Sequence, residues 1–125
     1  MAKPVLPSEA RAKIHDWHGE DVFVEGWLGE CKGYNCHIFD TLTEAKVVAN
    51  GSPESSAWDN AMDDCLSIGS ALNFDEIAAP MQFQKVQLFG RLSDRCRGFL
   101  GGCTDRVPDI QPAAIGLAVN YRKDK

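Results

Sequence analysis

The chain of 125 residues contains no apolar run approaching the roughly 18 residues needed to span a bilayer. Its start, Met1 to Ile14, lacks the apolar core of a secretory signal. We therefore expect a soluble protein that makes no membrane contact and resides in the cytoplasm. The alternative is an exported protein whose signal peptide is absent from this sequence.

Basic residues are scarce as well. The 13 Lys and Arg are outnumbered by 18 Asp and Glu, which gives a formal net charge of -5. Proteins that bind DNA through its phosphates usually have a basic excess, so non-specific DNA binding is disfavoured. The imbalance is local, because residues 47–84 contain no Lys or Arg, whereas the segment from Lys85 to Arg106 is basic enough to form a positively charged loop.

The motifs of common catalytic sites are missing. His15, His18 and His37 are dispersed, and no serine or cysteine lies in a nucleophile context such as Gly-x-Ser-x-Gly. The glycine-rich stretch from Gly98 to Gly102 is not followed by the lysine and helix of a phosphate-binding loop. We expect a protein without enzymatic activity.

The composition that is present indicates one folded domain. Apolar residues make up 44% and charged residues 25% of the chain, both ordinary values for a globular protein. A chain of this length has room for one core. We divide it into an N-terminal helical extension (1–20), a compact domain (21–120) and a polar tail (121–125).

Hydrophobic periodicity predicts a helix followed by strands. Residues 8–18 carry a helical stripe, with Ser8 as its N-cap and Gly19 at its end. Residues 22–28 have the two-residue repeat of a strand, and Gly26 inside it predicts a bulge or a sharp bend. A turn-rich piece then leads to a second strand at 36–41.

Short helical pieces alternate with strands in the rest of the chain. Residues 43–48 predict one helical turn, and 57–65 carry a weak helical stripe after a turn in which Ser52 would be the cap and Pro53 the first helical residue. The other expected elements are a strand at 65–70, a short helix at 74–79 ended by Pro80, a strand at 86–91, and a strand at 110–119 that Pro112 confines to a sheet edge.

Three strands, a short helix and two more strands follow one another in the order of the five-stranded Greek-key OB barrel. The expected fold class is therefore mainly β (α+β), an OB-like barrel with an added N-terminal helix, and the alternative is a generic β-sandwich. The segments 22–28 and 85–92 resemble the first and fourth strands of OB-fold modules of the anticodon-binding type.

Over roughly residues 20–115, the chain is also similar to small uncharacterised bacterial proteins that share the ending Cys-x6-Cys-x-Asp-Arg, here Cys96 to Arg106. Both resemblances imply a fold, and a fold by itself does not assign a function.

Four of the five cysteines form two local pairs, Cys31-x4-Cys36 and Cys96-x6-Cys103. In an OB barrel both pairs would lie in loops that flank the ligand-binding face, where four thiolates could hold a tetrahedral zinc ion. His37 could replace one of them. Zinc is the only cofactor that the sequence suggests, and only the first pair has the usual zinc spacing. The competing interpretations are disulfides, which need an oxidising compartment, and free thiols.

Aromatic and arginine side chains on the same strands and loops are the candidate ligand contacts. Aromatic faces stack on bases and sugars, although such rings more often fill a small barrel's core. Arginines can hold a phosphate or carboxylate, or can pair with neighbouring aspartates in a solvated loop. The candidates are Trp27, Tyr34, Phe89, Arg91, Arg95 and Arg97.

These observations lead to two functional hypotheses. The first is a small OB-fold binding module for single-stranded nucleic acid or another extended ligand, with a four-cysteine cluster that stabilises the loops of the binding face. The second is a protein-interaction or structural domain that does not bind nucleic acid, which the acidic balance favours.

Overall fold

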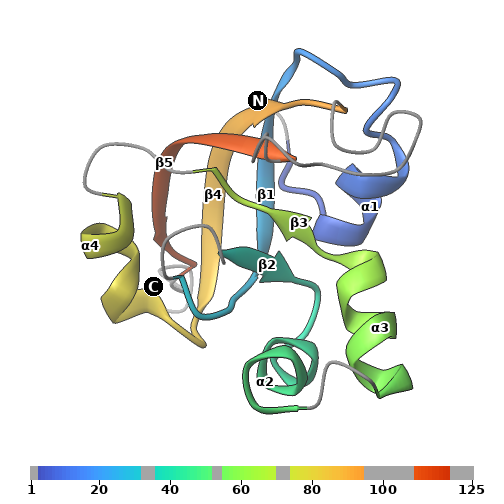
Figure 1. The fold of residues 1–125 in the computed structure, drawn as a ribbon. Coiled ribbons are helices and arrows are strands. Elements are labelled where there is room, and N and C mark those ends of the chain that lie inside the picture. Colours follow the sequence, from blue (N-terminus) through green and yellow to red (C-terminus); the bar gives the residue numbers. More distant parts are fainter. Residues whose placement is uncertain (1–2, 32–35, 52–54, 70–73, 95–108, 119–125) are drawn as a thin grey trace.

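A computed structural model describes residues 3–31, 36–51, 55–69, 74–94 and 109–118. Five antiparallel strands form one sheet in the order β3-β2-β1-β4-β5, curled into a half-barrel (Figure 1). The strands are β1 (Asp21–Leu28), β2 (His37–Phe39), β3 (Leu66–Ser67), β4 (Lys85–Leu92) and β5 (Ile110–Leu117). The expectation of five strands in an α+β fold is confirmed at this level.

The concave face of the sheet holds the main core. The alternation along strand β4 shows this, since Val86, Leu88 and Leu92 are buried while Phe89 and Arg91 between them are exposed. Side chains from the sheet meet α1 and α4 in one apolar cluster. Its buried members are Ala10, Ile14, Val24, Leu28, Cys36, Ile38, Leu66, Ile68, Phe74, Ala78, Val86, Leu88, Leu92 and Ile110.

The two outer strands of the sheet touch at one point. A parallel bridge joins Ile68, just after β3, to Ile110 at the start of β5, and the amide of Gly69 donates to the Ile110 carbonyl at 2.9 Å. Beside the bridge, the amide of Ser67 donates to the Asp109 carboxylate at 2.8 Å, and the amide of Asp109 donates to the Ser67 hydroxyl at 2.9 Å. These reciprocal bonds satisfy polar groups of Asp109, which is fully buried.

The N-terminal segment extends the sheet. Val5 pairs in parallel with Val24 on the edge of β1, through hydrogen bonds to Phe23 and Glu25 of 2.8 and 2.9 Å. Further along, the same edge of β1 pairs with β2 at Trp27 and Leu28. Residues of the predicted N-terminal helical extension also pack in the main core, as Ala10 and Ile14 do.

Gly26 lies where this edge of β1 changes partner. A Cβ atom there would lie 2.5 Å from the carbonyl oxygen of Phe39 and 2.7 Å from Pro7, so the position requires glycine. Of the predicted bulge or sharp bend at Gly26, the bulge is wrong, because the pairing of Gly26 with Val86 continues the regular β1–β4 register. The irregularity lies between β4 and β5 instead, at Phe89 and Gly90.

Helix α1 (Pro7–Ala12) is shorter than predicted. The prediction of Ser8 as N-cap is wrong, because the helix begins at Pro7 and Leu6 caps it without a side-chain bond. Both the amide and the hydroxyl of Ser8 donate to the Asp40 carboxylate, so a residue next to β2 accepts from the first turn. After Ala12 the chain continues in turns to Gly19, whose φ of 84° favours glycine.

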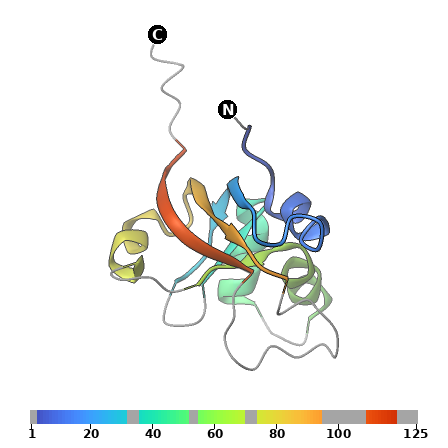
Figure 2. The same cartoon turned by 90° about the horizontal axis from the view of Figure 1, so that it is seen from above.

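Two full helices separate β2 from β3, where we predicted one turn and a weak stripe. Helix α2 (Leu42–Asn50) is capped by Thr41, and α3 (Ser56–Asp64) is capped by Ser55 rather than Ser52. The predicted helix before β4 is confirmed as α4 (Phe74–Ala78), which continues through Pro80 as the 3-10 helix η1 (Ala79–Met81). Figure 2 shows α4 at the left and α1 at the right of the sheet, and both contribute to the same core cluster. In the described residues, none of the helices has the length and apolar character to cross a membrane.

We expect Asp109→Ala to lower the free energy of unfolding by about 2–3 kcal/mol, because it removes a fully buried carboxylate and leaves the amide of the half-buried Ser67 without its acceptor. Urea denaturation followed by circular dichroism measures this change. Asp16→Ala, at an exposed aspartate, is the matched control. A loss no larger than that of the control would contradict the role given to these bonds.

Candidate ligand-binding site

Helices α2 and α3 form a hairpin beside β2 (Figure 1). A second apolar cluster lies between this hairpin and the outer face of the sheet. Its buried members are Phe39, Ala45, Ala61 and Cys65, and Trp27, Val48, Met62 and Phe83 pack against them. The hairpin therefore covers the outer face of β2.

The hairpin does not fill the space completely. A cavity of about 440 Å³ remains between α2, α3, β2 and the turn that follows β1. The lining residues are Gly29, Glu30, His37, Phe39, Ala45, Val48, Ala49, Gly51, Trp58 and Met62. This volume lies within the range of small-ligand sites, roughly 300–1,000 Å³.

The cavity combines an apolar wall with a few polar groups. Trp58 and Met62 are four residues apart on α3, so they face the same side of the helix and enter the lining together. Val48 and Ala49 contribute from α2. Glu30 is the one carboxylate among the lining residues that the structure describes, and such a mixture suits an amphipathic group better than a purely polar one.

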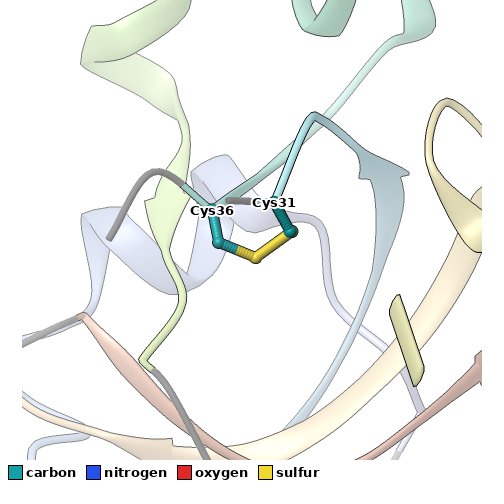
Figure 3. The surroundings of a disulfide bond; sticks show 2 residues. All are labelled: Cys31 and Cys36. Carbon is teal, nitrogen blue, oxygen red and sulfur yellow. A yellow bond between two sulfur atoms is a disulfide. The ribbon is translucent and has the colours of Figure 1, made fainter. Parts of the chain in front are cut away.

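A disulfide closes the turn that carries the polar part of the lining. The sulfur atoms of Cys31 and Cys36 are bonded at 2.02 Å (Figure 3). Glu30 directly precedes Cys31, and His37 directly follows Cys36. The amide of Gly29 donates to the His37 carbonyl at 3.0 Å. Glu30 therefore lies between a residue held by this hydrogen bond and a residue held by the disulfide.

Of the three interpretations of the first cysteine pair, the disulfide is the one that the structure contains. Bonded sulfurs are not thiolate ligands, so in this state Cys31 and Cys36 cannot contribute to the zinc site we considered. Cys96 and Cys103, the other proposed zinc ligands, lie outside the described residues. Within the described ranges, no group of His, Cys, Asp or Glu is arranged to hold a metal ion. Cys65 is a buried free thiol.

The predicted ligand contacts are dispersed rather than gathered at this cavity. Trp27 packs half-buried against the second cluster. Phe89 is 41% exposed on β4 and meets Phe23 edge to face, with ring centroids 6.5 Å apart. Arg91 pairs with Asp21 at 3.4 Å. Tyr34, Arg95 and Arg97 lie outside the described residues, so their predicted roles stay predictions.

Positive charge in the described part of the chain is largely engaged by the protein itself. Of its six Lys and Arg side chains, all but Lys3 have a contact with another group. The contacts are Arg11 with the Met62 carbonyl, Lys13 with the Trp17 ring, Lys46 with the Phe83 ring, Lys85 with Glu25 and Arg91 with Asp21. Asp59, Asp63 and Asp64, in contrast, are exposed on α3.

Two of the dispersed histidines come together at Asp94, which follows β4. Nδ1 of His15 lies 2.9 Å from one carboxylate oxygen of Asp94, and Nδ1 of His18 lies 3.1 Å from the other. The backbone amide of Asp94 also donates to Nδ1 of His18 at 3.1 Å. All three side chains are solvent-accessible, and the group ties the turn after α1 to the end of β4.

Comparisons with protein-family models, with curated proteins and with solved structures found no match for this chain. The candidate site therefore rests on the geometry described above.

Removing the disulfide tests its structural contribution. The double variant Cys31→Ala, Cys36→Ala should unfold with a free energy about 2 kcal/mol lower, because the bond closes a short loop in the unfolded chain. Thermal and urea unfolding under non-reducing conditions measure this difference. Cys65→Ala serves as the control for loss of a buried sulfur outside the bond, and equal losses in both variants would contradict the expectation.

The pKa of the Asp94 carboxyl lies below its usual value of 3.8, chiefly because His15 hydrogen-bonds to it. A carboxyl whose pKa is lowered in the folded state stabilises the protein above pH 3.8, and this contribution is lost as the pH falls through the folded-state value. The stability difference between the native protein and Asp94→Asn should therefore shrink from about pH 5 to about pH 2. Urea unfolding at each pH measures it, with Asp16→Asn as control. A difference that is constant with pH would count against this assignment.

Proposed function

We propose that the protein is a small OB-type module that binds a partner polypeptide, without catalysis, through the cavity between the α2–α3 hairpin and β2. The observation that carries this proposal is the position of the cavity beside the disulfide-closed turn between β1 and β2. In OB barrels, this turn and the face of the second and third strands are the usual binding surfaces.

The strand order supports the OB-type topology. The sheet has the order β3-β2-β1-β4-β5, and the parallel bridge between Ile68 and Ile110 links its two ends. Read as a ring, this gives every strand the neighbours that a five-stranded OB barrel requires, with α4 between the third and fourth strands. The helical hairpin between β2 and β3 is then an insertion at the binding face.

Charge supports a polypeptide over a nucleic acid as the ligand. A phosphate backbone needs accessible cations, and five of the six Lys and Arg in the described ranges already contact protein groups. The cavity adds a carboxylate, Glu30, and the neighbouring helix α3 adds exposed aspartates. These groups would repel phosphates.

The disulfide supports an oxidising compartment. Disulfides persist in secreted and periplasmic proteins and are rare in the cytosol, where thiols are kept reduced. Cys31 and Cys36 are bonded in the structure, so we propose that the protein acts outside the cytosol, in place of the cytoplasmic location first expected.

A blocked peptide series tests the proposed binding. The peptides are acetyl-Gly-Gly-X-Gly-Gly-amide with X as Lys, Arg, Leu, Phe or Glu, and an oligothymidylate is added as the nucleic-acid probe. Binding is followed by NMR through the indole signal of Trp58, which lines the cavity. We expect at least one peptide to shift this signal. Ala49→Phe should weaken its binding by about tenfold, because the ring would occupy space where the side chain of X enters.

Ala57→Phe on the exposed face of α3 is the matched control and should bind like the native protein. Circular dichroism checks that both variants fold. An indole shift with the oligothymidylate and with none of the peptides would overturn the proposal in favour of nucleic acid, and no shift with any probe would overturn it outright.

A further inference from the structure

We infer that the side chain taken up by the cavity is a lysine or arginine of the partner, with its cationic end at Glu30 and its apolar stem against α2 and α3. This inference rests on the proposed function and names the chemistry of the ligand. It follows from an anionic group, an aromatic ring and an apolar wall that share one lining.

The anionic end is the Glu30 carboxylate. Within the described part of the chain, no Lys or Arg lines the cavity and no salt bridge is formed by Glu30. A negatively charged ligand would therefore face a carboxylate without a counter-ion, whereas a cation would be attracted to it. Glu30 lies on the turn fixed by the disulfide and by the bond from Gly29 to His37, so its backbone is held in place before a ligand arrives.

The apolar part of the lining suits the stem of a long basic side chain. Lys and Arg bury their methylene groups on apolar surface while the charged end stays near polar groups or water. Val48 and Met62 supply such surface, and the half-buried ring of Trp58 can attract a cation over its face. A purely apolar ligand would fill the same space but would leave Glu30 unused.

The charge around the cavity favours the same ligand. Asp59 and Asp63 directly follow the lining residue Trp58 and the lining residue Met62 on α3, and both are exposed. Residues 47–84 contain no Lys or Arg. On α2, Lys46 places its Nζ 5.8 Å from the centroid of Phe83, a ring outside the lining. A basic segment of a partner would therefore approach the exposed carboxylates of α3.

A peptide with norleucine at X separates the charge from the stem, because norleucine is close in length to the lysine stem and is neutral. We expect the lysine and arginine peptides to bind two- to tenfold more tightly than the norleucine peptide, about the size of an exposed ion pair plus a cation–π contact. Only the charged peptides should weaken when the ionic strength rises from about 0.02 M to about 0.5 M.

Glu30→Gln tests the anionic end. It should weaken the binding of the lysine peptide by about two- to fivefold and leave the binding of the norleucine peptide unchanged. Glu76→Gln, which removes an exposed carboxylate on α4 outside the cavity, is the matched control and should change the binding of neither peptide.

Trp58→Leu tests the aromatic part of the lining. It should weaken the binding of the lysine peptide by about three- to tenfold, measured through the backbone amide signals of residues 45–49.

Equal binding of the norleucine and lysine peptides at the cavity would overturn the inference and leave the proposed function intact, since a polypeptide side chain would still enter. Tighter binding of the lysine peptide that is unaffected by Glu30→Gln and reduced by Glu76→Gln would also overturn it, because the attraction would then be spread over the surface. No binding by any peptide would remove both the inference and the proposed function.

Discussion

The half-barrel depends on the contact between its two outermost strands. Strand β3 has only two residues and β5 begins at Ile110, so few backbone bonds are available to join them. Two hydrogen bonds to side chains add to them, since the Ser67 amide donates to the Asp109 carboxylate and the Asp109 amide donates to the Ser67 hydroxyl. Asp109 is fully buried. A buried polar group left without a partner costs more free energy than a formed hydrogen bond gains. These bonds therefore fix the geometry of the contact more strongly than their net energy suggests.

This contact also determines where the second layer of the structure can lie. With β3 held beside β5, the chain between β2 and β3 must leave the sheet at Asp40 and return at Cys65 on the outer side. Helices α2 and α3 fill this connection and pack on Phe39. The cavity is where their packing on β2 remains incomplete.

The sequence was most informative where its periodicity was long. The alternation in β1 and β4 predicts both strands closely, because each has eight residues with one face buried. The short strands β2 and β3 carry too few residues for a distinct period, and their expected lengths exceed those observed. Helix α2 was predicted as a single turn, although the pattern Thr41-x-x-Glu44 is a recognisable helix start and places Thr41 as the cap.

The candidate site was less predictable than the fold for a physical reason. Its lining comes from a turn, a three-residue strand and two helices, so its residues share no local spacing in the sequence. His37 was considered only as a zinc ligand, and Trp58 and Met62 only as a helical stripe. The stripe was the usable signal, because an amphipathic helix between two strands must bury its apolar face somewhere on the sheet.

The disulfide connects the fold and the site most directly. It joins Cys31, which follows β1, to Cys36, which precedes β2. Cys36 is itself part of the main core. The neighbours of the two cysteines, Glu30 and His37, face the cavity on the other side of the sheet. Loosening this link would therefore act on the position of the Glu30 carboxylate more than on the core, which the remaining strands still enclose. The oxidation state of this cysteine pair and the shape of the candidate site are thus properties of the same turn.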